Sequence, residues 1–300
     1  MDPFSADGEL TTLHTYFHQC LYPAVLSYDL SPLSDSNKLP ATILQLRAHL
    51  ALNQYSEALS VCASNKGKVD FDAVAICARY MQAKDRGDGS SVTKASEEAS
   101  ALATKEGDNA TVQILCGTVL AGTENEDEAL ELLSRHQGSL DAVALIIQIH
   151  LQQNRLDLAK KEAQSARKWA QDNLLVNIAE SWVAMREGGE QYQSAYYVFE
   201  ELAQAPATQS VKSLLSQAIS EMHLGRLEES EAALKQAAEL EPENELVKAN
   251  QLVLLTLAGK RDEAAKAKPE LEKSGFAQDL AEKKKEFQAA CERYQPKFAA

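Results

Sequence analysis

The chain has 300 residues, of which 45% are hydrophobic and 25% charged, as is typical of a folded rather than a disordered protein. Its 44 acidic and 30 basic residues give a net charge of −14, which argues against nucleic acid or an anionic membrane as the main partner, because both favour cationic surfaces. Aromatic residues make up only 6%, so we expect a helical chain rather than an all-β one.

The sequence predicts no targeting or membrane-spanning segment. Residues 1–7 are acidic rather than basic and do not resemble a signal peptide. Residues 10–28 hold too many polar side chains to span a bilayer, and the apolar run 142–151 is too short. We expect a cytoplasmic protein with no direct membrane insertion, whose five widely spaced cysteines are reduced core thiols.

Two histidines near the start of the chain have a spacing that suits a metal. His14 and His18 lie four residues apart, with Cys20 two residues further on. One helical face could present both imidazoles to zinc, but a third ligand at a suitable spacing is missing. We interpret them as histidines on a helix surface and predict no metal site.

A short pattern recurs along the chain: Gly, Asn or another polar residue, then an aromatic residue or Leu, then a small residue that we call the pivot. One copy is Asn53-Gln54-Tyr55-Ser56-Glu57-Ala58. The pivots are 30 to 37 residues apart, with a mean near 34, which is the period of tetratricopeptide helix–turn–helix units. The alternative is a helical bundle with accidental spacing. The eight pivots are Ala24, Ala58, Ala95, Ala129, Ala159, Ala195, Ser230 and Ala264.

Packing explains the residue types of this pattern. Each pivot is small because the two helices of a unit approach most closely there, so a larger side chain would overpack the contact. Gly or Asn before the second helix ends the first one, because both tolerate a left-handed backbone. We predict an all-α, tetratricopeptide-like α-solenoid of about eight helix-turn-helix repeats over residues 1–270. A C-terminal capping helix within 271–300 completes the same domain.

Prolines and polar stretches mark the expected links. Pro206 and Pro242 each follow a second helix, where proline ends a helix without removing a needed donor. Pro269 falls inside the expected last second helix. Residues 64–70 and 84–92 are polar and contain glycine, so we expect loops there.

No arrangement of residues indicates catalysis. The fingerprints of phosphate loops, dinucleotide sites, zinc hydrolases and serine hydrolases do not occur. Carboxylate pairs such as Glu97-Glu98 are adjacent on a helix and do not face one another. We predict that the protein is not an enzyme and binds no cofactor.

In tetratricopeptide units the first helices line the concave surface, and counting back from the pivots identifies its residues. Most are apolar, which favours a groove for a buried partner; the alternative is that they pack inside a tightly coiled superhelix. The predicted partner-binding residues are Ile114, Thr118, Ala144, Gln148, Leu151, Leu215, Ile219, Met222, Ala249 and Val253.

Aromatic residues gather at one place in this aromatic-poor chain. They suit either the core between two stacked repeats or an aromatic anchor for a partner. The cluster consists of Trp182, Tyr192, Tyr196, Tyr197 and Phe199.

The C-terminal segment predicts one amphipathic helix, to which we assign the capping role because repeat arrays need a terminal cap with a polar outer side. Lys283-Lys284-Lys285 lies between its apolar positions, and we interpret this run as a solvated face rather than a binding patch. The apolar positions are Phe276, Leu280, Phe287, Cys291, Tyr294 and Phe298.

Several blocks together resemble the epsilon subunit of coatomer, and the likeness is most convincing from about residue 140 to 260. An early unit at Arg47-Ala48-His49-Leu50-Ala51-Leu52 is similar too. The main blocks are Asn154-Arg155-Leu156-Asp157-Leu158-Ala159-Lys160-Lys161-Glu162, Ala179-Glu180-Ser181-Trp182-Val183, Gly188-Gly189-Glu190, Ser194-Ala195-Tyr196-Tyr197-Val198-Phe199-Glu200-Glu201 and Met222-His223-Leu224-Gly225-Arg226-Leu227-Glu228-Glu229-Ser230-Glu231.

The resemblance implies a noncatalytic structural subunit of a vesicle coat that works in Golgi-to-ER retrograde and intra-Golgi transport. It implies that the solenoid curls around and stabilises the C-terminal domain of the alpha subunit of coatomer, with other coat subunits as indirect partners. The protein would then be cytoplasmic and peripheral on Golgi membranes and coated vesicles, through the coat complex.

Two other classes of protein make different demands on the sequence. One alternative is a tetratricopeptide co-chaperone or another scaffold adaptor gripping a partner peptide; a co-chaperone that grips an acidic C-terminal peptide would need Lys, Arg and Asn on the concave positions to hold carboxylates. A helical toroidal hydrolase would need convergent carboxylates. The mostly apolar concave positions disfavour the first, and the sequence offers no such carboxylates for the second.

Overall fold

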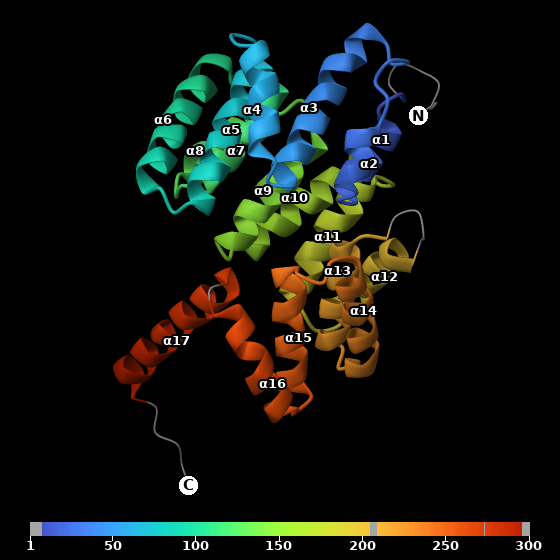
Figure 1. Ribbon diagram of the computed structural model, residues 1–300, viewed down its shortest axis with the longest axis vertical. Coiled ribbons are helices and arrows are strands. Elements are labelled where there is room, and N and C mark those ends of the chain that lie inside the picture. The colour runs from blue at the N-terminus through green and yellow to red at the C-terminus, as the bar shows by residue number, and fades with distance from the viewer. Residues whose placement is uncertain (1–7, 205–208, 273, 296–300) are drawn as a thin grey trace. The chain divides into compact units, whose positions relative to one another are not determined.

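The structure, a computed structural model, describes residues 8–204, 209–272 and 274–295 (Figure 1). These residues form seventeen α-helices and one short 3₁₀-helix, with no strand among them. The chain divides into two compact units, Met1–Val198 and Phe199–Ala300. Within the described segments, no helix combines the length and the apolar character that crossing a membrane would need.

The N-terminal unit contains eleven helices and the start of a twelfth. They are α1 (Thr11–His18), α2 (Tyr22–Ser27), α3 (Asp35–Ala51), α4 (Tyr55–Ser64), α5 (Val69–Asp85), α6 (Gly89–Glu106), α7 (Ala110–Ala121), α8 (Glu126–Leu133), α9 (Leu140–Gln152), α10 (Leu156–Trp169), α11 (Leu174–Glu187) and α12 (Gln191–Gln204). The C-terminal unit contains the end of α12 and the remaining elements. These are α13 (Val211–His223), α14 (Leu227–Leu240), α15 (Glu245–Leu257), α16 (Arg261–Ala267), the 3₁₀-helix η1 (Lys268–Leu271) and α17 (Gly275–Tyr294).

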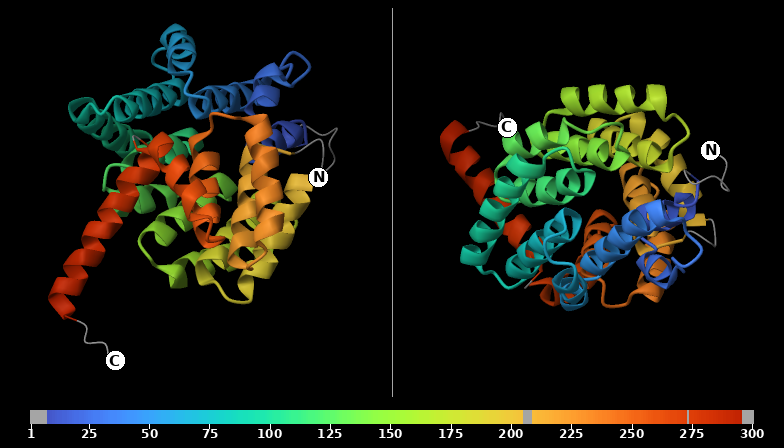
Figure 2. Two further views of the ribbon diagram at one scale, coloured as in Figure 1. Left: turned by 60° about the horizontal axis from the view of Figure 1, so that its bottom comes forward. Right: turned by 90° about the horizontal axis from the view of Figure 1, so that it is seen from above.

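Consecutive helices form the predicted pairs, and every predicted pivot lies on the second helix of a pair, from Ala24 on α2 to Ala264 on α16 (Figures 1 and 2). The six inner pivots are at most 2% exposed, whereas the two outermost are half-buried. Ser230 fits this position because its hydroxyl donates a hydrogen bond to the Ala218 carbonyl on the paired helix, at 2.9 Å. The tetratricopeptide-like α-solenoid is therefore confirmed.

The turn inside each pair uses a left-handed residue. Asn154 and Gly225 show the predicted form, with φ of 57° and 76°, because Asn and Gly adopt this backbone at little cost. The sequence pattern did not anticipate Cys20 and Glu124, which have φ of 62° and serve the first and fourth pairs. Cys20 is therefore a half-buried turn residue rather than the core thiol we expected.

Side-chain caps begin the first helices from the fourth pair onward. The Asn109 side chain accepts a hydrogen bond from the Val112 amide at 3.0 Å, and Ser139 accepts one from the Ala142 amide at 3.3 Å. Such caps satisfy amides that the first turn of a helix leaves open. Asn173, Ser210 and Asn244 play the same part for α11, α13 and α15. The first helices of these pairs therefore begin at residues that the caps define.

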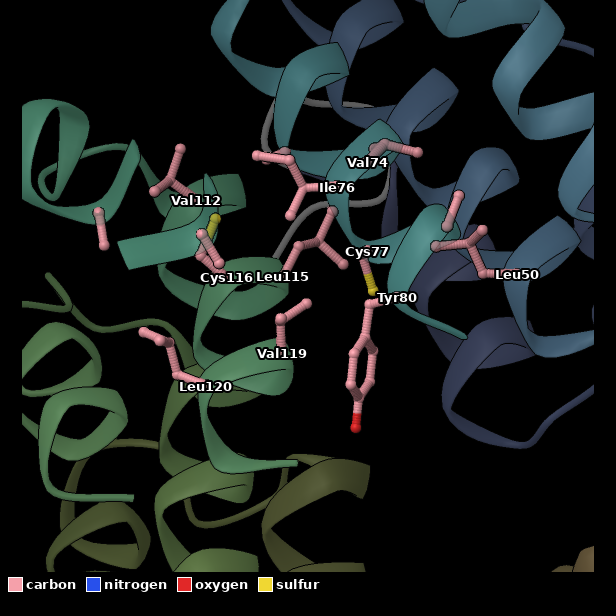
Figure 3. Close-up of a cluster of buried hydrophobic side chains, with 14 of the residues drawn as sticks. Leu50, Val74, Ile76, Cys77, Tyr80, Val112, Leu115, Cys116, Val119 and Leu120 are labelled. Carbon is pink, nitrogen blue, oxygen red and sulfur yellow. The ribbon is translucent and has the colours of Figure 1, made fainter. Parts of the chain in front are cut away.

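The core of the N-terminal unit forms where first helices meet. Figure 3 shows side chains of α5 and α7 packed together, among them Val74, Cys77, Val119 and Leu120, each at most 2% exposed. Burial raises the pKa of the Cys77 thiol to about 12, so it stays protonated. Of the five cysteines, Cys62, Cys77 and Cys116 are buried, while Cys20 and Cys291 are half-buried; all five are free.

Proline and loop positions depart slightly from expectation. Helix α16 ends at Ala267, and Pro269 lies in η1, because proline cannot donate the next helical hydrogen bond. The expected loops at 64–70 and 84–92 are shorter, since α5 begins at Val69 and α6 at Gly89. Pro242 follows α14 as predicted. Pro206 lies outside the described residues.

The predicted C-terminal helix is present as α17, but none of its residues is buried. Leu280, Phe287 and Tyr294 are 38%, 71% and 71% exposed, so this apolar face is uncovered in the free chain. Its role as a cap, and the division into 1–270 and 271–300, stay predictions. Phe298 lies outside the described residues.

Enlarging a buried pivot should destabilise the chain, because α3 and α4 leave no room for added carbons. We expect Ala58→Leu to lower the free energy of unfolding by about 1–3 kcal/mol. Ala63→Leu makes the same change at an exposed position of α4 and should have little effect. Urea unfolding followed by circular dichroism measures both. If both variants lowered the free energy of unfolding equally, the contact at the Ala58 pivot would not be tightly packed.

Glu221 in the C-terminal unit is 2% exposed. One carboxylate oxygen accepts a hydrogen bond from the Gln217 amide nitrogen at 2.9 Å, while the other, Oε2, has no hydrogen-bond partner among the described residues. Burial raises the pKa of this carboxyl above its ordinary value, although the Gln217 hydrogen bond opposes the shift. The folded chain therefore holds this proton more tightly than the unfolded chain does.

Ionisation of Glu221 above its folded pKa should consequently disfavour folding. We expect Glu221→Gln to raise the melting temperature at pH 8, with a difference that shrinks as the pH falls through the folded pKa. The difference should be lost below the unfolded pKa of about 4.3. Melting curves from pH 4 to 8 test this, with Glu228→Gln as the exposed control. If Glu221→Gln raised the melting temperature by the same amount at every pH, ionisation of Glu221 would be ruled out as the cause.

Candidate partner-binding surface

The inner face of the N-terminal unit is built from the first helices of successive pairs. Helices α3, α5, α7 and α9 each turn one stripe of residues toward it, at spacings of three to four. On α9 this stripe runs from Asp141 through Leu145 and Gln148 to Gln152, and on α7 from Ala110 to Ala121. Two cavities open along these stripes, one toward each end of the helices.

The first cavity has a volume of about 330 Å³ and lies near the N-terminal ends of α5, α7 and α9. Leu39, Pro40 and Ile43 of α3 and Ile114 of α7 give it an apolar wall. Its polar lining includes the caps of α7 and α9, Asn109 and Ser139, and consists of His14, Arg47, Asp70, Asn109, Thr111, Ser139 and Asp141.

An ion pair joins α3 to α9 at the edge of this cavity. The Arg47 guanidinium donates to Asp141 Oδ1 at 2.7 Å, and the two side chains are only 16% and 15% exposed. The same guanidinium lies over the Phe17 ring of α1, 4.5 Å from its centroid, which adds a cation–π contact. His18 Nε2 lies 3.6 Å from the other oxygen, Asp141 Oδ2. Helices α1 and α3 therefore meet α9 at Asp141, which lies 94 residues beyond Arg47 along the chain.

The neighbours of Asp141 stabilise the charged form of its carboxyl group. Burial raises the pKa of the Asp141 carboxyl, but the charge of Arg47 and the neighbouring His18 outweigh burial and hold the pKa below its ordinary value. Burial lowers the pKa of His14, which favours its neutral imidazole, and Asp141 only partly opposes that effect. Asp141 is thus ionised and paired in the folded chain.

The second cavity, of about 340 Å³, lies near the C-terminal ends of α5, α7 and α9. The Tyr80 hydroxyl donates to the Gly122 carbonyl at 3.0 Å, and a Cβ on Gly122 would lie 2.1 Å from that hydroxyl oxygen. Glycine is therefore required at this close approach. Across the same cavity, the Tyr55 hydroxyl donates to Asp85 Oδ2 at 2.6 Å.

The cavities contain three of the five inner-face residues predicted in this unit. Ile114 lines the first cavity, and Thr118 and Gln148 line the second. Leu151 is half-buried against the core of the α9–α11 helices. Ala144 is 7% exposed and packs among residues of α9, α10 and α11. Ala144 therefore has little exposed area in the free chain, and its contact with a partner stays a prediction.

In the C-terminal unit, too, some of the predicted residues are partly exposed and others are buried. Ile219, Met222 and Val253 are half-buried and keep side-chain area for a partner. Leu215 and Ala249 are 5% and 3% exposed, and Leu215 belongs to the core between α13 and α14. Partner binding by the ten predicted residues stays a prediction in both units.

The aromatic cluster separates into two environments. Trp182 packs against the core formed by α9, α10 and α11, and Phe199 is 4% exposed. Tyr197 is 61% exposed, so it has area for a contact outside the chain. The core interpretation holds for Trp182 and Phe199.

Sequence reasoning missed Arg47 and Asp141 as residues of the surface. Both lie on helices that the repeat pattern located, but nothing in their local sequence indicates that they meet, because 94 residues separate them. A charged residue within an apolar helical stripe, as Arg47 is between Leu44 and Leu50, was the available signal.

The sequence of the chain matches one family of known proteins. Residues 6–295 match the family model described as coatomer epsilon subunit. The chain is 26% identical over 256 residues to the probable coatomer subunit epsilon of Schizosaccharomyces pombe, covering 85% of this chain and 83% of the relative. It is 27% identical over 262 residues to coatomer subunit epsilon-1 of Arabidopsis thaliana, covering 87% of each.

Among solved structures, the chain is similar to the crystal structure of the APC/C hetero-tetramer Cut9–Hcn1, with a TM-score of 0.61 and 15% sequence identity. The match covers 93% of this chain and 54% of that chain, so this chain spans about half the length of that relative. At this identity the likeness supports the fold alone.

Breaking the Arg47–Asp141 pair should destabilise the N-terminal unit. Arg47→Met leaves a largely buried carboxylate without its partner, and we expect a loss of about 3 kcal/mol in the free energy of unfolding. Replacing both partners, as Arg47→Met with Asp141→Leu, should recover most of it, because no unpaired charge remains. Urea unfolding measures the three free energies that this comparison needs.

Lys160→Met is the control for these variants, because the Lys160–Glu187 pair is 38% and 34% exposed. We expect it to change the free energy of unfolding by less than about 1 kcal/mol. A double variant as unstable as Arg47→Met alone would contradict the electrostatic account.

Proposed function

Because this chain belongs to the coatomer epsilon subunit family, we propose that its inner face binds and stabilises the C-terminal domain of the alpha subunit of coatomer. Membership of the family makes the chain a structural subunit of the vesicle coat, associated with other coat subunits. The match over residues 6–295 carries the proposal, because it includes all the helix pairs whose first helices form the inner face.

The chemistry of the inner face supports a protein segment as ligand. The first cavity offers an apolar wall from Leu39, Pro40, Ile43 and Ile114 beside capped helix starts, which suits an apolar side chain flanked by backbone polar groups. In the C-terminal unit, Ile219, Met222 and Val253 leave further apolar area half-exposed. A partner that covers such area stabilises the bound chain by mass action.

The proposal includes the place of work. We infer that the protein acts in Golgi-to-ER retrograde and intra-Golgi transport. It would be cytoplasmic and peripheral on Golgi membranes and coated vesicles, held there by other subunits. The net charge of −14 is consistent with recruitment through proteins rather than through anionic lipid. In this role the subunit is noncatalytic.

A co-chaperone that grips an acidic peptide is less compatible with the first cavity. The cavity's arginine, Arg47, is already paired with Asp141, and Asp70 adds a second negative charge to the lining. An incoming carboxylate would meet like charge there rather than a cationic clamp. The cavity therefore favours an apolar or neutral segment.

Charges placed on the predicted face of the C-terminal unit should abolish binding. We expect Ile219→Asp with Met222→Asp to lose copurification with the C-terminal domain of the alpha subunit, because a partner would have to bury two unpaired carboxylates. Helical content by circular dichroism should be retained, since both side chains are half-buried in the free chain.

The matched control is Ala232→Asp with Leu240→Asp, which places two charges on exposed positions of the second helix α14. This variant should copurify as the unchanged chain does. If the Ile219 and Met222 variant kept its affinity, the assignment of the inner face in this unit would be wrong.

A further inference from the structure

Three side chains of metal-ligand type converge beside the first cavity. His14 and His18 come from α1 and Asp141 comes from α9, and one ligand atom of each lies within 4.8 Å of the other two. The sequence offered two imidazoles at helical spacing and no third ligand. The fold supplies the third from a helix more than a hundred residues further along the chain.

The distance between His18 Nε2 and Asp141 Oδ2 fits a shared ion better than a hydrogen bond. His18 Nε2 and Asp141 Oδ2 are 3.6 Å apart, beyond normal hydrogen-bond length. Two ligands about 2.0–2.1 Å from a tetrahedral zinc ion are separated from each other by about 3.4 Å. His18 Nε2 is also buried without a hydrogen-bond partner among the described residues. A coordinated ion would satisfy this atom.

The surroundings of Asp141 resemble the outer shell of a metal site. Arg47 holds Oδ1 at 2.7 Å and so orients the carboxylate, leaving Oδ2 directed toward the histidine. His14 and Asp141 also line the first cavity, which gives an ion a path from solvent and leaves room for a water as fourth ligand. The Arg47 charge opposes a cation nearby and lowers its affinity.

We propose that His14, His18 and Asp141 bind one Zn²⁺ ion that clips α1 to α9. Two imidazoles and one carboxylate form a donor set that zinc accepts in proteins, with a water completing the tetrahedron. Because the ligands come from the first and fifth helix pairs, the ion would close one turn of the N-terminal unit. With Arg47 close by, we expect a dissociation constant on the order of micromolar.

Metal titration of the full chain tests the proposal. Protein stripped with a chelator and dialysed is titrated with Co²⁺, whose visible absorption reports tetrahedral nitrogen and oxygen ligands, and the Co²⁺ is then displaced with Zn²⁺. We expect one ion per chain and a Zn²⁺-dependent rise in melting temperature. The absence of Co²⁺ absorption and of saturable Zn²⁺ binding up to about 1 mM would overturn the proposal.

Variants identify the ligands. His14→Gln and His18→Gln should each weaken Zn²⁺ binding by at least about 100-fold, since each removes one of three protein ligands. Both variants keep the Arg47–Asp141 pair, so they should fold without metal, as circular dichroism can verify. His136→Gln, outside the cluster, is the control and should bind as the unchanged chain does.

Unchanged affinity in both His14→Gln and His18→Gln would place any bound ion elsewhere and contradict the proposal. His18 and Asp141 would then be neighbours without a bound ion.

Discussion

The pairing of Arg47 with Asp141 joins α3 and α9 of the N-terminal unit, which belong to the second and fifth helix pairs and are not neighbours in the repeat array. In a repeat array each unit usually contacts only its neighbours, so curvature accumulates without a fixed end point. Here Arg47 of α3 and Asp141 of α9 meet at 2.7 Å, and α1 contacts α11. The pair thereby fixes how far the first turn of the superhelix closes. The first cavity, whose walls come from both sides of this closure, depends on it.

If the inner face binds a partner as proposed, this closure links stability to recognition. Arg47 is at once the partner of Asp141, a neighbour of the Phe17 ring and a lining residue of the cavity. A ligand in the cavity would therefore contact the groups that hold α1 and α3 in place, and its binding would favour the closed turn. Buried ion pairs contribute little net stability but strongly penalise arrangements that separate them. Such a pair suits a surface that must keep one shape.

The repeats could be predicted from the sequence because their causes are local. A small pivot such as Ala159 and a left-handed residue such as Asn154 act within one helix pair, so the spacing located all eight pairs. The closure at Asp141 could not be predicted, because it depends on small rotations summed over several pairs. For the same reason the sequence did not foresee that Ala144 is buried, since that depends on where α10 and α11 pack.

Hydrogen exchange of α1 tests the central claim most directly. This helix has eight residues and would be unstable by itself, so its protection reports its contacts with α2, α3 and α11 and the approach of His18 to Asp141 of α9. We predict slow exchange of α1 amides in the unchanged chain. In Arg47→Met, exchange of α1 should be about tenfold faster or more, with α14 of the C-terminal unit unaffected. Equal exchange of α1 in both proteins would contradict closure through Arg47 and Asp141.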